Sequence, residues 1–239
     1  MTDSILPVSL ITPTYNEREN IGLLVAEIFE VVDAEPGIDL ELIVVDDNSP
    51  DGTAAAAEAL TDRYAVKVVR RPGKLGLGSA VMDGFGQSTR PILGVMDADL
   101  SHDPVVLPRL IAALRDHDIA IGSRFGAESR VERWPWHRKM ISVVGVSAAR
   151  LLTGVEDPLS GYFVLHRRAL GNLRLTSSGY KILLEILVKG NCRSHLSLPI
   201  VFRNRQFSQS KLNWREHFLF AKQILYFAWW KLARSRSGE

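Results

Sequence analysis

At 239 residues the chain is long enough to bury a substantial core, as one large domain or two small ones. Its 46% hydrophobic and 23% charged residues are ordinary for a globular protein, and no apolar run reaches the length of about 18 residues needed to span a bilayer. The net charge of +2 is unevenly distributed, because residues 1–62 hold 14 acidic residues and one basic residue, a balance of −13 that leaves +15 for the remainder. This asymmetry indicates an acidic half suited to holding a metal and a second half suited to anions such as phosphates or anionic lipid.

From the first strand to about residue 122, short apolar runs rich in β-branched residues alternate with helical patterns. Strands are predicted at 7–15, 40–47, 66–70, 92–97 and 118–122. Helices are predicted around the apolar positions of 21–32 and at 53–60, 77–88 and 104–116. This alternation predicts a doubly wound α/β sheet that is mostly parallel.

The second half of the chain is less regular. A basic, aromatic connector at 130–139 is followed by predicted helices at 138–153 and 180–190, and by predicted strands beginning near 160 and 196. We expect one α/β domain over residues 1–212, with its last third an elaboration, followed by an amphipathic helix over 213–239.

Acidic residues follow the predicted strands at the ends where ligands bind in such sheets. Glu17 comes after the first strand, Asp46 and Asp47 after the second, and Asp97 and Asp99 after the fourth. Carboxylates at positions i and i+2 can converge on one hard cation, or one can bind the cation while the other contacts a nucleotide; Mg²⁺ and Mn²⁺ prefer such oxygen ligands. The alternative is an Asp-rich turn that caps the helix at 104–116.

Two further segments are open to more than one interpretation. The stretch "VVDDNSPDG" resembles the acidic pocket of a receiver domain, but it can equally contact a nucleobase or ribose, or form a simple turn. The stretch "GKLGLGSA" lacks the residue order of a P-loop or a dinucleotide fingerprint, so it indicates a close backbone approach or a helix start. We expect His102 to be a turn residue.

Taken in order, the motifs resemble a known family. "TPTYNEREN", "VVDDNSPDGT", "GKLGLGSA", "DADLSHDP", "IGSRF", "DPLSGYFVLHRRAL", "GYKILLEIL" and "SQSKL" are similar to those of inverting nucleotide-sugar glycosyltransferases of family two with a GT-A fold. More narrowly, they resemble dolichyl- or polyprenyl-phosphate mannose synthases. The resemblance covers roughly residues 8–212 and implies a Rossmann-like sheet with flanking helices.

The resemblance also implies roles for particular residues. The pocket for the base and ribose of the donor is expected to contain Pro13, Tyr15, Glu17, Val45 and Asp47. At the diphosphate it implies Asp97, Ala98 and Asp99, with the two acids holding Mg²⁺ or Mn²⁺; Ser101 stands where some relatives carry a glutamine that reaches the metal. The expected cationic and acceptor-phosphate residues are Arg124 at both phosphates, Arg138 and Ser142 at the acceptor phosphate, and Arg205 and Lys211 at the donor, on a mobile loop that matches the family's R-x-x-G-x-S-K pattern with Ser208 in place of its glycine. Asp99, Arg124 and Lys211 are the expected catalytic residues.

The implied reaction is transfer of mannose from GDP-mannose to a polyprenyl monophosphate. A phosphate monoester is largely anionic near neutral pH, since its second pKa is about 6, so the acceptor needs cations that bring two anions together more than it needs a base. A metal and nearby Arg or Lys residues would stabilise the departing diphosphate. This requirement accounts for the basic excess outside the acidic first quarter of the chain.

The C-terminal stretch predicts contact with a membrane surface. Residues 218–232 are mostly apolar, include Trp229 and Trp230, and are bounded by basic residues, as in an interfacial helix; the alternative is a core helix. We expect a peripheral protein at the cytoplasmic face of a membrane, with a possible membrane partner subunit and no nucleic-acid partner. The start of the chain shows no signal-peptide pattern, and Cys192 is the single cysteine, so no internal disulfide can form.

Three other functions remain open from the sequence. The nearest is transfer of glucose or another sugar from a UDP donor to a polyprenyl phosphate. A receiver-like, non-enzymatic module would be built on Asp46 and Asp47, and a membrane-surface adaptor would use only the C-terminal helix. Donor profiling separates the first from GDP-mannose transfer. Failure to bind a nucleoside diphosphate, together with phosphorylation by acetyl phosphate, would favour the receiver-like module, and unchanged activity in the cell after Asp99→Ala would favour the adaptor.

Overall fold

The computed structural model describes residues 5–126, 129–131, 136–171, 173, 181–203 and 214–237, and it leaves the side chains of 131, 136–142, 144, 214–219 and 234–237 undescribed. The strands are β1 (Leu6–Thr14), β2 (Ile38–Asp46), β3 (Val66–Arg70), β4 (Ile92–Val95), β5 (Ile119–Ser123), β6 (Arg130–Val131), β7 (Phe163–His166), β8 (His195–Pro199) and β9 (Val201–Phe202). The helices are α1 (Arg18–Asp33), α2 (Thr53–Glu58), α3 (Leu77–Gln87), α4 (Leu107–Ala113), α5 (Trp136–Thr153), α6 (Ile182–Lys189) and α7 (Trp214–Ser237). Two 3₁₀ turns, η1 (Pro104–Val106) and η2 (Arg167–Leu170), complete them.

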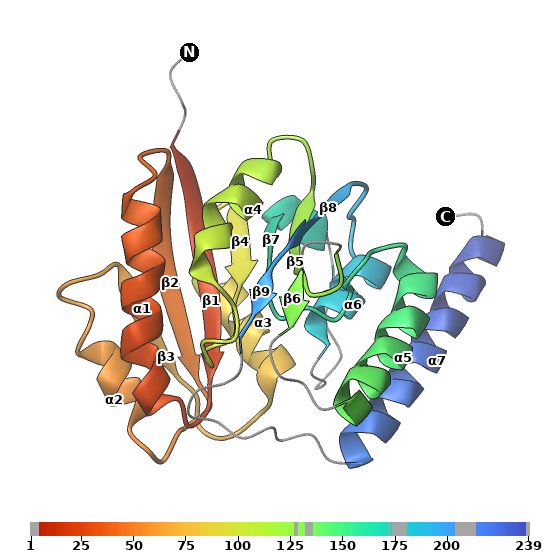
Figure 1. Ribbon diagram of the computed structural model, residues 1–239, viewed down its shortest axis with the longest axis horizontal. Coiled ribbons are helices and arrows are strands. Elements are labelled where there is room, and N and C mark those ends of the chain that lie inside the picture. Colours follow the sequence, from red (N-terminus) through yellow and green to blue (C-terminus); the bar gives the residue numbers. More distant parts are fainter. Residues whose placement is uncertain are drawn as a thin grey trace.

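Seven strands form one sheet in the order β3-β2-β1-β4-β7-β5-β8, and β6 pairs with β9 in a small second sheet (Figure 1). Within the large sheet every pairing is parallel except those of β7, which runs antiparallel to both β4 and β5. The predicted mostly parallel α/β sheet is therefore confirmed.

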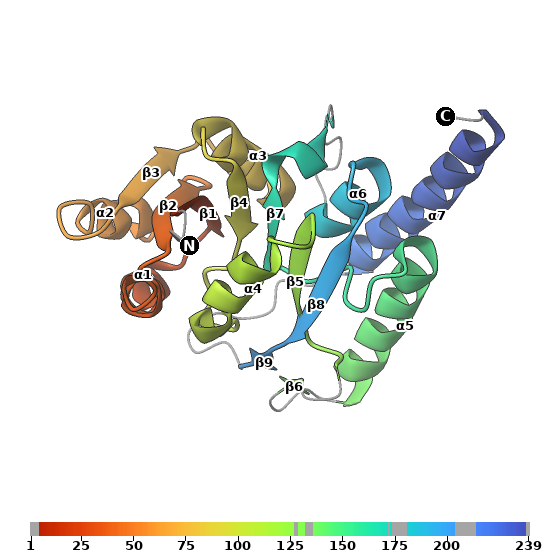
Figure 2. The ribbon, with the colours of Figure 1, turned by 90° about the horizontal axis from the view of Figure 1, so that it is seen from above.

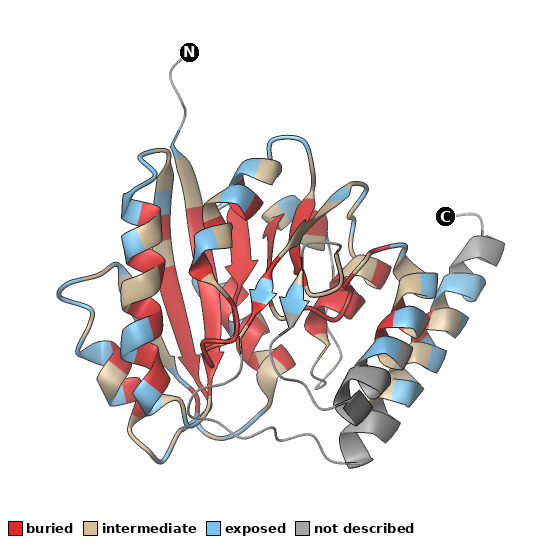
Figure 3. Cartoon of the chain, in the orientation of Figure 1, coloured by how far each residue is buried: buried red, intermediate tan, exposed pale blue. Residues whose placement is uncertain are grey.

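Helices cover both faces of the sheet (Figure 2). On one face α1 and α4 cover a core that includes Leu10 and Leu42 of the strands with Leu24 and Leu110 of the helices. On the other face α3 contacts β1 and β2 and, together with α6, covers a second core that includes the alternate strand residues Ile11 and Ile43. The central strands β1, β2, β4, β5 and β7 are mostly buried on both sides (Figure 3), which is why they appear in the sequence as continuous apolar runs.

The C-terminal helix α7 is present and packs beside α5 and α6 (Figure 1). Phe227 anchors it, because its ring is 1% exposed among Val146, Ala149 and Leu184. No helix in the described part of the chain combines the length and the apolar content that crossing a bilayer requires. The separation into a domain at 1–212 and a helix at 213–239 stays a prediction.

Some element boundaries differ from those predicted. The expected helix at 104–116 begins as η1, continues as α4 and ends at Ala113; Pro104 and Pro108, which lack backbone N–H donors, occupy the starts of these two pieces. The expected strand at 196–202 is divided into β8 and β9, and the connector after residue 130 begins with the short strand β6.

Replacement of Gly84 by alanine tests the packing of α3 on the sheet. A Cβ atom there would lie 2.5 Å from Cγ2 of Ile11 and 3.2 Å from Cγ2 of Val45, and overpacking of this kind costs about 1–3 kcal/mol. Gly86→Ala in the same helix meets nothing within 4 Å and is expected to stabilise the protein by roughly 0.5–1 kcal/mol. Urea unfolding followed by circular dichroism measures both changes, and equal effects would contradict this packing.

Candidate active site

The carboxyl ends of the parallel strands form one continuous edge. The backbone N–H of Asp47 donates to the carbonyl of Thr14 (3.0 Å), and that of Arg71 donates to the carbonyl of Asp46 (2.9 Å). Asp97 follows β4, which pairs with β1 on its other side. The sheet therefore gathers acids that are separated by about 50 residues in the sequence.

The chain turns sharply as it leaves three neighbouring strands. Asn16, Asn48 and Leu100, which follow β1, β2 and β4, have φ values of 58°, 59° and 59°. Asparagine tolerates this left-handed conformation, but a leucine there is strained by about 1–2 kcal/mol. Strain of this kind concentrates at functional sites, and Leu100 lies directly after the second acid of the Asp97–Asp99 pair.

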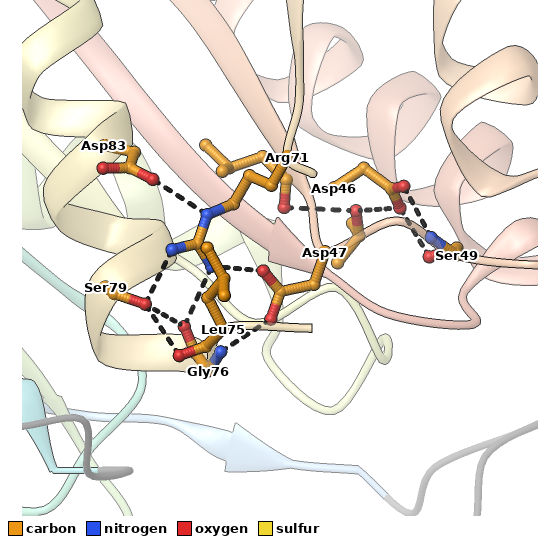
Figure 4. Close-up of polar contacts among 10 residues, drawn as sticks. Asp46, Asp47, Ser49, Arg71, Leu75, Gly76, Ser79 and Asp83 are labelled. Atoms are coloured by element: carbon orange, nitrogen blue, oxygen red, sulfur yellow. Dashed lines mark hydrogen bonds and ion pairs between the residues drawn. The ribbon is translucent and has the colours of Figure 1, made fainter. Parts of the chain in front are cut away.

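Arg71 organises the edge beside Asp47 (Figure 4). Its guanidinium is 3% exposed, forms an ion pair with Asp47, and donates to Asp83 (2.8 Å) and to the hydroxyl of Ser79 (2.7 Å). The other carboxylate oxygen of Asp47 accepts from the backbone N–H of Gly76 (2.9 Å). Asp47 thereby fixes the glycine-rich loop that leads into α3.

The residues expected at the donor base lie along this edge. Pro13 and Val45 are register partners in β1 and β2, and both are buried; the Val45 side chain packs against α3. Tyr15 is half-buried, and the Lys74 ammonium lies 3.9 Å from the centroid of its ring. Glu17 directly precedes α1, and its carboxylate accepts from the side-chain amide of Asn20 (2.6 Å).

Asp97 and Asp99 lie in the turn after β4. The Asp97 side chain is 28% exposed, whereas Asp99 is 5% exposed and accepts from the backbone N–H and hydroxyl of Ser101. Ala98 between them is buried in the core. Ser101 therefore orients Asp99.

The oxygen donors of this turn fit a hard divalent cation. In the described part of the chain no cluster of three or more His, Cys, Asp or Glu side chains is arranged as metal ligands. Asp97 and Asp99 would thus supply two carboxylates, and Mg²⁺ commonly completes its shell with water and substrate phosphate oxygens.

Arg124 is held by a buried acid. Its Nε and Nη2 donate to the two carboxylate oxygens of Asp157 at 2.7 and 2.9 Å, and its backbone N–H donates to the same group. Burial lowers the pKa of Arg124, but the hydrogen bonds and charge of Asp157, with the charge of Asp97, outweigh burial and leave that pKa raised. Asp157 therefore fixes the Arg124 guanidinium, the group that would contact a phosphate.

His102 has a different environment from the one expected for a turn residue. It forms an isolated antiparallel bridge with Phe202 and is 1% exposed. Its ring lies against Tyr162 and Phe202, with centroids 5.3 and 5.2 Å away, and its Nε2 is 3.6 Å from Oδ2 of Asp97.

Several expected residues remain without a structural description. Arg205 and Lys211 lie outside the described residues, and Arg138 and Ser142 lie on α5 with their side chains undescribed. Their proposed roles at the donor and acceptor phosphates stay predictions.

Sequence reasoning missed Arg71 and Asp157. The sequence did contain a signal for Arg71, which directly follows the predicted strand at 66–70. A basic residue at that place can neutralise an acid at the end of a neighbouring parallel strand, such as Asp47. Asp157 had no such signal, since "VEDPLSG" gives no indication that this acid meets Arg124, 33 residues earlier.

The comparison with known proteins agrees with the resemblance. Glycosyl transferase family 2 matches residues 9–183. A dolichol-phosphate mannosyltransferase of Pyrococcus furiosus is 41% identical over 232 residues, which are 95% of this chain and 65% of that protein. A polyprenol monophosphomannose synthase of Mycolicibacterium smegmatis is 38% identical over 217 residues, which are 85% of this chain and 80% of that protein. The chain thus spans just under two thirds of the length of the first relative.

Solved structures share the fold. A glucosyl-3-phosphoglycerate synthase from Mycobacterium tuberculosis, in complex with Mn²⁺, UDP and glucosyl-3-phosphoglycerate, superposes with a TM-score of 0.68 at 20% identity, covering 95% of this chain and 80% of that one. The mannosyltransferase PcManGT from Pyrobaculum calidifontis, in complex with GDP-Man and Mn²⁺, gives 0.64 at 21% identity, covering 95% and 64%. The predicted GT-A fold is confirmed.

Two neighbouring arginines test the importance of the Arg71 cluster. Arg71→Met leaves the buried Asp47 carboxylate without its partner, and breaking a buried pair in this way costs about 3–5 kcal/mol. Arg70→Met is the matched control, because the Arg70–Glu58 pair is solvent-exposed and its loss is expected to leave stability unchanged. Guanidinium unfolding compares the two variants; similar midpoints would contradict the central place of Arg71.

Proposed function

Because the chain belongs to glycosyl transferase family 2, we propose that it transfers mannose from GDP-mannose to a polyprenyl or dolichyl monophosphate. The observation that carries the proposal is the 41% identity with a dolichol-phosphate mannosyltransferase over 95% of this chain. The 38%-identical relative, a polyprenol monophosphomannose synthase, supports the same class of acceptor. The carboxyl edge supplies what such a reaction needs: oxygen ligands for a cation and fixed positive charge nearby.

The proposed chemistry is a single displacement. An oxygen of the acceptor phosphate forms a bond to C1 of mannose while the bond from C1 to the diphosphate breaks, and GDP leaves with the electron pair. One displacement inverts the anomeric centre. The acceptor phosphate already carries negative charge, since its second pKa is about 6, so no strong base is required.

Different residues of the edge would bind the donor, the cation and the acceptor. Asp97 and Asp99 would hold Mg²⁺ or Mn²⁺, which when bound stabilises negative charge on the departing diphosphate. Arg124, fixed by Asp157, would present its remaining N–H donors to phosphate oxygens. The family resemblance adds Arg205 and Lys211 at the donor, and Arg138 and Ser142 at the acceptor.

The base and ribose would lie against the end of β1 and the Arg71 cluster. Tyr15 is half-buried at this edge, and an aromatic ring there would suit packing against a nucleobase. Asp47 would line this pocket as a fixed wall, because Arg71 and Gly76 occupy its two oxygens. The same occupancy argues against a receiver-like module built on Asp47.

The substrate lipid requires contact with a membrane, and we propose that α7 provides it. Leu225, Trp229 and Leu232 recur at helical spacing and are 70%, 64% and 66% exposed, while Phe227 on the opposite side is buried against α5 and α6. Lys222 and Lys231 are exposed on the same helix and suit anionic headgroups. The attachment would be peripheral and at the cytoplasmic face, with which a single cysteine is compatible.

A transfer assay tests the activity. The purified chain is incubated with radiolabelled GDP-mannose, a short polyprenyl phosphate and Mn²⁺ or Mg²⁺, and label is counted in the organic phase. We expect Asp99→Asn to lose about 10²–10³-fold in rate, as when one electrostatic group at a developing charge is removed. The exposed acid Asp116, changed to Asn, is the matched control and should keep full activity.

The donor arm of the assay separates the alternatives. Lipid-phase label from a UDP-sugar, with none from GDP-mannose, would mean that the chain catalyses the UDP-dependent reaction and not mannose transfer. Absence of lipid-phase label with every donor would overturn the proposed activity while leaving the family assignment intact.

Vesicle sedimentation tests the membrane surface. Replacing Leu225 and Trp229 together by alanine should weaken binding to anionic vesicles by tenfold or more, because each large apolar side chain contributes about 1.5–3 kcal/mol on burial. Leu23→Ala, which removes a half-exposed leucine from α1, should bind as the parent does. Equal binding by all three proteins would exclude α7 as the contact.

A further inference from the structure

His102 is a buried polar residue for which the mechanism above has no use. Its side chain is 1% exposed, and neither ring nitrogen has a hydrogen-bond partner. A buried donor that is left unsatisfied costs about 1–3 kcal/mol, so its place in the structure calls for an explanation. The nearest charged group is Asp97, whose Oδ2 lies 3.6 Å from Nε2.

The aromatic neighbours of His102 fix the direction of its ring. Tyr162 lies at 5.3 Å with a tilt of 49°, and Phe202 lies nearly perpendicular at 5.2 Å. His102 and Phe202 also form a backbone bridge, and the N–H of Arg203 donates to the carbonyl of Ser101 (2.9 Å). The imidazole therefore cannot turn away from Asp97 without disrupting a packed unit.

Gly161 confines the Asp97 carboxylate from a second direction. A Cβ atom at Gly161 would meet the Cγ and both oxygens of Asp97 at less than 3.0 Å, so the carboxylate lies directly on the glycine backbone. Gly161 precedes Tyr162, the residue against the His102 ring. The two residues before β7, Gly161 and Tyr162, therefore contact the Asp97 carboxylate and the His102 ring respectively.

We infer that His102 is a positioning residue for Asp97, donating from Nε2–H to Oδ2 when the carboxylate holds a divalent cation. A movement of about 0.7 Å would shorten the 3.6 Å separation to the usual N–H···O distance of about 2.9 Å. A hydrogen bond to a metal-binding carboxylate fixes which oxygen faces the ion, and loss of such a bond typically costs 10–100-fold in metal affinity. The inference rests on the proposed function, because it requires the cation site at Asp97 and Asp99.

The test measures Mn²⁺ affinity in the presence of GDP, from the electron paramagnetic resonance signal of free Mn²⁺ in solutions of the full chain. His102→Phe keeps an aromatic ring between Tyr162 and Phe202 but has no donor, and we expect about 10–100-fold weaker binding. His102→Gln places an amide N–H donor where Nε2 lies and should bind within a few-fold of the parent. Parent-like affinity in His102→Phe would overturn the inference.

A second pair of variants keeps the test decisive if the phenylalanine protein does not fold. His102→Asn carries the same amide as His102→Gln but places it where Nδ1 lies, so only the glutamine variant should retain affinity. Equal affinities for the two amides would also overturn the inference. Thermal unfolding of each variant accompanies the titration, because a purely structural role would change stability without separating glutamine from asparagine.

Asp97→Asn distinguishes failure of this inference from failure of the proposed function. If Asp97→Asn binds Mn²⁺ and GDP as the parent does, the cation site itself is wrong. If Asp97→Asn loses Mn²⁺ while His102→Phe retains it, the site stands and only the role of His102 fails.

Discussion

The constraint on which this molecule depends is electrostatic repulsion at one edge of its sheet. Parallel strands bring their carboxyl ends together, and here two of those ends carry paired acids, Asp46 with Asp47 and Asp97 with Asp99. Carboxylates gathered in this way need positive charge close by. The two acidic pairs differ in the positive charge that the chain places beside them.

In the first pair Asp47 is neutralised from within the chain, while Asp46 accepts hydrogen bonds from Thr14 and Ser49. Arg71 pairs with Asp47 in a nearly dry environment and ties it to the loop at Gly76, so this end of the edge is rigid before any ligand arrives. The second pair is arranged differently, because the Asp97 side chain is partly exposed and lies near His102, and the positive charge of Arg124, which is itself paired with Asp157, acts on it. The edge thus combines a preformed wall at Asp47 with the Asp97–Asp99 pair, which an added cation would complete. Such an arrangement suits the binding of a nucleoside diphosphate. Preorganisation of this kind lowers the cost of binding, because little of the site has to be ordered by the ligand.

The sequence was sufficient for the parts of the structure that follow from local pattern. Strands buried on both faces give unbroken apolar runs, and amphipathic helices between them give a regular period, so the sheet and the acids at its edge could be predicted. The antiparallel pairing of β7 and the buried Arg124–Asp157 pair could not be predicted from local pattern. Both depend on contacts between segments more than 30 residues apart in the sequence. His102 was misjudged for the same reason: a histidine in a polar turn has no local mark of burial, which here comes from Tyr162 and Phe202.

The most direct test of this account is the location of Mn²⁺ in crystals grown with GDP, by anomalous scattering at the manganese absorption edge. We expect one strong peak between the carboxylates of Asp97 and Asp99, with the GDP diphosphate on its open side and the base toward Tyr15. A peak at Asp46 and Asp47, or bound GDP with no metal at Asp97 and Asp99, would contradict it.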